Sequence, residues 1–371
     1  MLESEIAACS RLLDEVAGAP VEIAGIHGLG SRWAPVERMV LARDYPRIGR
    51  SVVVKTRRHD EAGWGGSLSN LITEQRCLAF LEAAGLCVAP ELLAFDEAAG
   101  VLVMSDLGPA PSVEQVLFGS NYDNATFALI ELAACTGLVH ASTTSIGHDV
   151  WNESSLFVQE LERPWQRLTS EAERLGFPDP RPASSDVAAL DAAIMDAQWR
   201  TFTHGDLTPG NALVRDDGVR LIDFEGAGPR HAMLDGAAFR LSFPQYGRWA
   251  ALPQKIVALA DDAYRTELAK GLPLAEDDVA YGKAMATGCA AWALVRLSRI
   301  AVISTEDQDA QVKLRRRSQI VHTVESCVSA AEETGSFPAL MTWFVSVIEE
   351  MRRRWPEARD EPKRFPAFGS E

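Results

Sequence analysis

The sequence of 371 residues predicts an α+β fold with two lobes, a small N-terminal lobe built on a five-stranded sheet plus a helix and a larger, mostly helical C-terminal lobe. Three observations support this prediction. Short apolar or alternating runs, typical of strands, lie within the first 104 residues. Apolar residues recur at helical spacing over most of the chain from residue 122 onward. The chain is also long for one domain and suits two lobes that share a cleft.

Composition limits the class of protein. Apolar residues make up 47% and charged residues 24% of the chain, as expected for a soluble globular protein without a membrane span. The N-terminus lacks the basic-then-apolar form of a signal peptide, and the six cysteines are scattered without a C-x-x-C pair. We therefore expect a reduced, cytoplasmic protein without structural zinc. The net charge of −16 argues against a nucleic-acid-binding surface.

The strands and helices of the N-terminal lobe follow from local patterns. A short amphipathic helix is expected over 5–17, and a second helix over 70–84 that ends at Gly85. Alternating or β-branched runs predict the strands, at 21–26, 36–41, 51–55, 90–95 and 100–104. Helices are predicted for the C-terminal lobe at 122–143, 186–199, 249–270, 276–302, 307–333 and 338–354.

The residues that carry chemistry lie between positions 203 and 225. His204-Gly205-Asp206 places a carboxylate on a tight turn, Asn211 follows five residues later, and Asp223 ends a short apolar run. Two apolar runs around the polar turn 216–218 predict a β-hairpin that would bring these side chains to one end. Phosphoryl transfer needs such a set: an acid that orients the attacking hydroxyl, and an amide with a carboxylate that hold Mg²⁺.

These motifs resemble the aminoglycoside phosphotransferase and choline kinase group of small-molecule kinases. Protein kinases proper carry H-R-D and D-F-G, whereas this chain has His204-Gly205-Asp206 and Asp223-Phe224-Glu225, which favours the small-molecule branch. The resemblance implies a bilobal protein-kinase-like fold with an antiparallel N-terminal sheet. It also implies that Asp206 is the catalytic base, that Asn211 and Asp223 are the metal ligands, and that Mg²⁺ with ATP or GTP is required.

The same resemblance assigns the nucleotide-binding residues. Lys55 ends the third strand, where it would contact the phosphates and pair with Glu74 of the following helix. The glycine-bearing turn between the first two strands would lie over the phosphates, at Gly28, Gly30 and Ser31. The hinge that joins the lobes would bind adenine through its backbone, around Ser105 and Leu107. We place the lobe boundary next to it, with 1–108 as the nucleotide-binding lobe and 109–371 as the catalytic and acceptor-binding lobe.

Other positions leave alternatives open. The glycine-rich stretch 59–69 would close over a ligand or be only a loop. The less regular stretch 147–183 would line the acceptor pocket or be a surface excursion. Asp235 matches the position from which family members brace the catalytic loop, and His140 is expected to be a helix-packing histidine. The arginine runs at 315–317 and 352–354 are expected on solvated helix faces, relevant only to an anionic acceptor.

The predicted function is transfer of a γ-phosphate to a hydroxyl of a small molecule, with an antibiotic or other natural product as the acceptor. One alternative is a metabolite kinase for an amino alcohol, a sugar or homoserine. Another is a nucleotide-binding protein without catalysis that works through partners. A protein kinase is disfavoured because H-R-D and the D-F-G glycine are missing, as is a recognisable activation segment.

Overall fold

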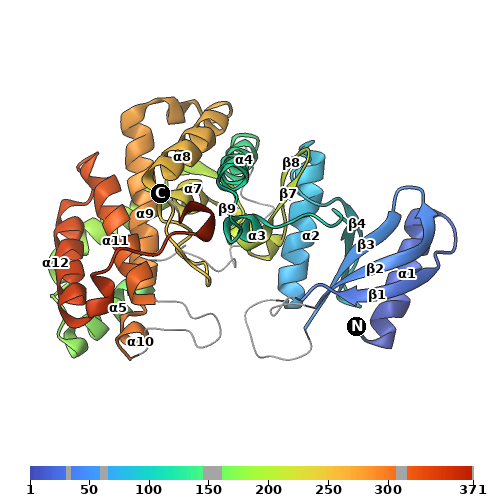
Figure 1. Ribbon diagram of the computed structural model, residues 1–371, viewed down its shortest axis with the longest axis horizontal. Helices are drawn as coiled ribbons and strands as arrows, with labels where there is room; N and C mark the ends of the chain where they lie inside the picture. Colours follow the sequence, from blue (N-terminus) through green and yellow to red (C-terminus); the bar gives the residue numbers. More distant parts are fainter. Residues whose placement is uncertain (31–34, 59–65, 145–160, 306–315, 370–371) are drawn as a thin grey trace. The chain divides into compact units, whose positions relative to one another are not determined.

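The computed structural model describes residues 1–30, 35–58, 66–144, 161–305 and 316–369 (Figure 1). The chain forms two compact units. The first contains Met1–Ala110 and Arg215–Gly228, and the second contains Pro111–Val214 and Pro229–Glu371. The segment from 215 to 228, which holds Asp223, therefore groups with the N-terminal residues. The roles assigned to the lobes 1–108 and 109–371 stay predictions.

The first unit is built on one five-stranded sheet in which every neighbouring pair is antiparallel, as predicted. The strand order is β1-β2-β3-β5-β4. Their bounds are β1 (Ile23–Gly28), β2 (Val36–Tyr45), β3 (Gly49–Thr56), β4 (Leu92–Asp96) and β5 (Val101–Ser105). The β-branched run of β3 occupies the centre of the sheet, where both edges of a strand are paired and a buried side chain is favoured.

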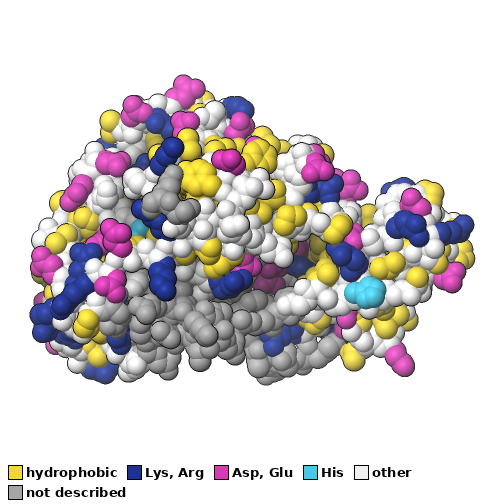
Figure 2. Space-filling view, viewed as in Figure 1, with side chains coloured by type: hydrophobic (Ala, Val, Ile, Leu, Met, Phe, Trp, Pro, Cys, Tyr) yellow, Lys and Arg dark blue, Asp and Glu magenta, His cyan; other side chains and the backbone are white. Residues whose placement is uncertain are grey.

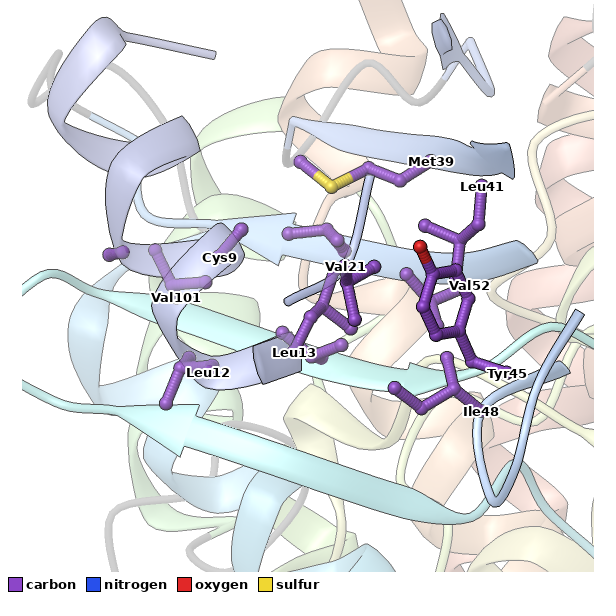
Figure 3. Close-up of a cluster of buried hydrophobic side chains, with 13 residues drawn as sticks. Cys9, Leu12, Leu13, Val21, Met39, Leu41, Tyr45, Ile48, Val52 and Val101 are labelled. Carbon is purple, nitrogen blue, oxygen red and sulfur yellow. The ribbon is translucent and has the colours of Figure 1, made fainter. Parts of the chain in front are cut away.

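Helix α1 (Glu3–Ala17) covers one face of this sheet and closes an apolar core. Its Leu12 and Leu13 pack with Met39 of β2 and with Val52 and Val101 of the sheet (Figure 3). Since successive strand residues point to opposite faces, Val52 and Val54 lie in this core whereas Lys55 faces the other side. The pleat of β3 thereby directs the lysine away from α1.

Helix α2 (Leu68–Ala83) begins at a capping box in which the Ser67 hydroxyl accepts from the backbone N–H of Asn70. The helix carries Glu74 on its buried side. Strand β8 (Gly218–Leu221) belongs to the same unit, where the Leu221 N–H donates to the carbonyl of Val88 at 2.7 Å. Together with β7 (Ala212–Arg215) it forms the predicted two-stranded sheet.

The second unit is mostly helical. Strands β6 (Arg200–Thr203) and β9 (Gly228–His231) pair with each other. The helices are α3 (Val113–Leu117), α4 (Tyr122–Ala141), α5 (Glu162–Leu175), α6 (Ser184–Ile194), α7 (Met233–Arg240), α8 (Gln254–Ala269), α9 (Asp278–Leu297), α10 (Ile300–Thr305), α11 (Arg316–Glu332) and α12 (Pro338–Arg354). On the face shown in Figure 2, acidic and basic side chains are mixed, and basic side chains gather over α12.

Glycines set the spacing of the central helices. A Cβ added at Gly137 of α4 would lie 2.4 Å from the Tyr264 carbonyl oxygen of α8, and one at Gly288 of α9 would lie 2.2 Å from the Met233 carbonyl oxygen. Only a residue without a side chain lets these backbones approach so closely.

Among the described residues, α4 alone is long and apolar enough to cross a membrane. Its length and composition are weak evidence for a membrane span, because 56% of the stretch is buried in the structure and the core helices of soluble proteins meet the same criteria.

Several elements differ from the sequence prediction. The expected helix 276–302 is two helices, α9 and α10, and the expected helix 186–199 ends at Ile194. Residues 226–229, whose Gly and Pro are typical of a turn, include the start of β9 at Gly228, and Pro229 is tolerated there because a two-stranded sheet leaves one strand edge without a hydrogen-bond partner. Within 147–183, residues 147–160 lie outside the described part of the chain, whereas 162–175 forms the regular helix α5. The polar residues of α5 obscure its helical pattern, since only Leu168 and Ala172 are buried.

Candidate active site

The loop of the predicted catalytic residue Asp206, called the catalytic loop below, follows β6 in the second unit. Gly205 has φ +82°, in the left-handed region that favours glycine, so the chain turns sharply between His204 and Asp206. The Asn211 amide nitrogen donates to the Asp206 carboxylate at 3.1 Å and to its backbone carbonyl at 2.9 Å. The structure therefore brings the predicted base and the predicted amide ligand together. It also commits the amide nitrogen, which leaves the Asn211 oxygen as the atom that would face a cation.

Asp235 of α7 braces this loop from inside the second unit. Its carboxylate accepts from the backbone N–H groups of His204 at 2.6 Å and Gly205 at 3.3 Å. Burial acts to raise the pKa of Asp235, but the His140 ring, 3.5 Å away, and the loop hold it below its ordinary value. Asp235 is 3% exposed. Its two hydrogen bonds from the loop backbone are strong, because their acceptor is a buried, charged carboxylate.

His140 has a more specific position than the helix-packing role expected for it. Its Nδ1 lies 2.9 Å from the Tyr264 hydroxyl of α8, and its Nε2 faces Asp235. The histidine therefore links α4, α7 and α8 behind the catalytic loop. Its place at the end of an apolar helix does not reveal these contacts, because the partners lie 95 and 124 residues further along the sequence.

The first unit contains the predicted ion pair. The Lys55 ammonium, 5% exposed, lies 2.8 and 2.6 Å from the two Glu74 carboxylate oxygens. It also lies 2.5 Å from Asp223 Oδ1. Burial lowers the pKa of the ammonium, but the charges of Asp223 and Glu74 outweigh this effect and raise it above its ordinary value. Lys55 is therefore a permanent cation held between two carboxylates.

Asp223 adopts a left-handed backbone conformation, with φ 68° and ψ 58°. Such conformations are uncommon outside glycine and cluster at functional sites, although Asp tolerates them better than most residues. The turn directs the Asp223 carboxylate to Lys55 and begins the short segment Phe224–Gly226, which contacts α2. The backbone strain thus accompanies a specific placement of the carboxylate.

Glu225 is a functional candidate that the sequence analysis treats only as a departure from D-F-G. Its carboxylate is 8% exposed and accepts from the Gly66 N–H at 3.2 Å, while its carbonyl accepts from the Asn70 amide at 3.4 Å. Burial, together with the charge of Asp223, raises the pKa of Glu225 to about 7. A carboxylate two residues from a predicted metal ligand is the signal that would have found it.

Asp106 holds the predicted hinge in place and lies between the two hinge residues, Ser105 and Leu107. Asp106 accepts from the Ser51 hydroxyl at 2.6 Å and from Arg38 Nη2 at 3.0 Å. Burial acts to raise the pKa of Asp106, but these bonds lower it below its usual value. Ser105 ends β5, and the Leu107 carbonyl accepts from the Arg215 guanidinium. The hinge backbone is therefore fixed against the sheet.

A pocket of about 280 Å³ lies beside the hinge in the first unit. Ser105, Leu107 and Arg215 contribute to its wall, together with Cys87. Cys87 is exposed, whereas the other five cysteines of the chain are buried.

The glycine turn is only partly described. Gly28 ends β1 opposite Glu37, and Gly30 has φ +77°, a conformation that suits glycine. Ser31 lies outside the described residues. The role of this turn over the nucleotide phosphates stays a prediction.

The donor set of the first unit suits a divalent cation. Two carboxylates, those of Glu74 and Asp223, lie against the ammonium of Lys55. This excess of negative charge is what Mg²⁺ or Ca²⁺ would neutralise. Within the described residues no group of three or more His, Cys, Asp or Glu side chains is placed so that it could hold a metal ion. Mg²⁺ in kinases needs no such cluster, since it binds one or two carboxylates plus phosphate oxygens.

Solved structures share this architecture. The chain matches a choline kinase from Cryptosporidium parvum Iowa II with a TM-score of 0.52 and 11% identity, covering 88% of this chain and 93% of that one. It matches a choline/ethanolamine kinase family protein from Mesorhizobium loti with a TM-score of 0.51 and 16% identity, covering 90% and 99%. An amicoumacin kinase in complex with AMP-PNP, Ca²⁺ and Ami matches with a TM-score of 0.50 and 14% identity, covering 90% and 97%.

These likenesses show a protein-kinase-like fold. Residues 38–267 match the model of the phosphotransferase enzyme family, APH, which is more than half of the chain. The chain belongs to this phosphotransferase family. A comparison with curated protein sequences finds no match.

Proposed function

We propose that this kinase transfers the γ-phosphate of ATP or GTP to a hydroxyl group of an antibiotic or other natural product. The observation that carries the proposal is the position of Lys55 between Glu74 and Asp223. A buried ammonium held by one carboxylate of the helix and one of the D-F-E segment is the arrangement that kinases use to position nucleotide phosphates. The charge excess around it supports Mg²⁺ as the cofactor.

The residues of the chain have separate roles in this proposal. Asp206 accepts a hydrogen bond from the acceptor hydroxyl and aims it at the phosphorus atom. An Asp with an ordinary pKa of about 3.9 is a weak base at neutral pH, so orientation is its main contribution. Lys55 positions the phosphates, Glu74 orients Lys55, and Asn211 and Asp223 would hold the metal. When bound, Mg²⁺ would neutralise charge on the phosphate oxygens.

The remaining roles concern binding. The backbone around Ser105 and Leu107 would bind the adenine or guanine base, and the turn at Gly28, Gly30 and Ser31 would cover the phosphates. Asp235 and His140 fix the catalytic loop so that Asp206 needs no reorganisation during transfer. We further propose that the protein acts in the cytoplasm as an antibiotic-resistance type of kinase, without a nucleic acid or membrane partner.

A metabolite kinase is the alternative for the acceptor, because choline and choline/ethanolamine kinases share the fold. A nucleotide-binding protein without catalysis is the alternative for the reaction. The geometry of the loop favours catalysis over binding alone, since Asn211 donates to Asp206 and the backbone N–H of His204 donates to Asp235.

The test is release of ADP or GDP from the purified chain with Mg²⁺, in the presence of aminoglycosides, macrolides, nucleoside antibiotics, amino alcohols and sugars. We expect one class of compound to stimulate release. Asp206→Ala should abolish the stimulated release but retain nucleotide binding, whereas Asp216→Ala, in the exposed β7–β8 turn, should behave as wild type. Turnover by Asp206→Ala close to that of wild type would refute the assignment. Nucleotide binding without stimulation by any compound would favour the binding-protein alternative.

A further inference from the structure

Arginine side chains from several elements gather at one end of helix α9 in the second unit. Arg296 lies in the last turn of α9, Arg299 follows the helix, and Arg316 begins the described part of α11. They are close enough that the charges of Arg299 and Arg316, after burial, lower the pKa of Arg296 to about 10. Arg316 and Arg167 of α5 act on Arg299 in the same direction. Several positively charged side chains therefore lie close together in a chain whose net charge is −16.

The buried member of this group lacks a counter-ion. Arg296 is 9% exposed, and its Nε has no hydrogen-bond partner. Its Nη2 donates to the neutral Gln319 amide oxygen at 3.1 Å. Within the described part of the chain no carboxylate pairs with Arg296 or with Arg299. Buried charges are normally paired, so a guanidinium in this position could take an anionic partner that the described residues do not supply.

A purely structural role explains only part of this arrangement. The C-terminal end of a helix carries partial negative charge, and one cation in the last turn of α9 is therefore favourable. That effect amounts to about half an elementary charge and falls off within one turn. It does not explain why Arg299 and Arg316 are added beside Arg296, where each raises the electrostatic cost of the other.

Hydrogen bonds connect Arg296 to the catalytic loop inside the same unit. The Leu207 carbonyl, next to Asp206, accepts from Gln245 Nε2 at 2.8 Å. Gln319 Nε2 donates to the carbonyls of the residues on either side of Gln245, at 2.9 and 3.3 Å. Gln319 Oε1 accepts from Arg296. Two glutamine side chains therefore separate the loop of Asp206 from the guanidinium, so a ligand bound at Arg296 would be coupled to that loop through these hydrogen bonds.

We propose that Arg296 and Arg299 bind an anionic group, a phosphate or a carboxylate, carried by the acceptor molecule. This inference rests on the proposed kinase function, because it concerns the acceptor of that reaction. A guanidinium offers planar, paired N–H donors that match both kinds of oxyanion. Arg316 adds positive potential that would attract the anion to this end of α9. The acceptor is then a hydroxyl compound with a negative charge, rather than a polycation.

The first experiment measures anion binding to the full chain without relying on turnover. The thermal unfolding temperature is recorded with inorganic phosphate and with chloride at equal ionic strength, in the presence of AMP-PNP and Mg²⁺ to fill the nucleotide site. We expect phosphate to raise the unfolding temperature of wild type. Arg299→Ala, at an exposed position, and Arg296→Lys, which keeps the charge, should lose this increase. The control Arg353→Ala, on the exposed face of α12, should retain it.

The second experiment uses acceptors in matched sets, such as glucose, glucose 6-phosphate and gluconate, together with anionic and neutral members of the other compound classes. We expect the active acceptors to carry phosphate or carboxylate, and the set distinguishes the two. For such an acceptor, Arg299→Ala should reduce kcat/KM by roughly 10- to 100-fold, mainly through KM. The KM for the nucleotide serves as the internal reference.

The outcomes separate this inference from the proposed function. Turnover of neutral or cationic acceptors that is insensitive to Arg299→Ala would overturn the anionic acceptor while the kinase function stands. Phosphate binding that depends on Arg296 and Arg299, with no turnover of any acceptor, would support the anion site and count against the kinase function. Equal phosphate effects in wild type and both variants would overturn the anion site.

Discussion

The backbone N–H of His204 donates to Asp235 Oδ2 over 2.6 Å, so the catalytic loop is fixed to helix α7 by a buried carboxylate. Asp235→Asn keeps the shape of the side chain but removes its charge and half of its acceptors. We expect kcat to fall, with a smaller change in the KM for the nucleotide, and the free energy of unfolding to fall by about 2–3 kcal/mol. Steady-state kinetics and urea unfolding measure both, with the exposed Asp262→Asn as the control. An unchanged kcat would show that the loop is held by other contacts.

Lys55→Met tests the charge balance of the first unit. The substitution leaves the buried Glu74 and the partly buried Asp223 without a cation, so we expect a loss of about 3 kcal/mol in the free energy of unfolding. It also removes the cation that would contact the phosphates, and kcat/KM for the nucleotide should fall by roughly 100-fold or more. Lys283→Met, at an exposed position of α9, is the matched control. Stability equal to that of wild type would contradict the buried pair.

Gly137→Ala tests the close approach of α4 and α8. Alanine favours a helix over glycine by about 1 kcal/mol, so an exposed site would gain stability. At Gly137 the added Cβ would meet a backbone carbonyl at 2.4 Å, and overpacking of this kind costs about 1–3 kcal/mol or more. We expect a net loss, seen as a lower midpoint of unfolding. Gly247→Ala, where nothing lies within 4 Å, should not show it. A more stable Gly137→Ala protein would mean that the helices separate easily.

His231 should make stability depend on pH. Its ring is buried, stacks on Trp199, and accepts at Nδ1 from the Met233 N–H, which requires the neutral form. Burial, with a smaller effect of His140, lowers the pKa of His231 to about 3. An unfolded histidine titrates near 6.5, so this stabilisation is complete above that pH and is lost as pH falls towards 3.

Between pH 7 and pH 5 the loss from His231 amounts to about 2 kcal/mol. In His231→Phe the difference in unfolding free energy between these two pH values should shrink by that amount. This expectation does not depend on how much the substitution lowers the unfolding free energy at pH 7. Denaturant unfolding of both proteins at pH 5, 6 and 7 measures it. Parallel pH profiles would show that the ring is protonated in the folded protein.

Local patterns were sufficient to predict the sheet of the first unit and most helices of the second. The β-branched run before Lys55 and the helical spacing around Glu74 each specify an element, and their order along the chain predicts that they pair. The roles of Asp206, Asn211, Asp223 and the nucleotide-binding residues stay predictions. They rest on the spacing of the motifs and on the family to which the chain belongs.

The contacts that could not be predicted join residues far apart in the sequence. His140 and Asp235, or Arg296 and Gln319, meet because helices pack, and no periodic pattern records which side chains will face each other. Glu225 could have been noticed from its spacing to Asp223, but its burial and its contact with the backbone of Gly66 are seen only in the structure. The sequence around Arg299 is typical of a solvated surface charge. Its neighbouring arginines become known only from the packed structure.

The exposed thiol of Cys87 beside the hinge has a practical consequence. A maleimide fluorophore should attach at this single position of the folded wild-type protein, because the other five cysteines are buried. The dye would lie in the wall shared with Ser105 and Leu107, so its emission should respond when a base binds to the hinge. Nucleotide affinities of every variant above can then be compared by titration, without turnover and without replacing a cysteine.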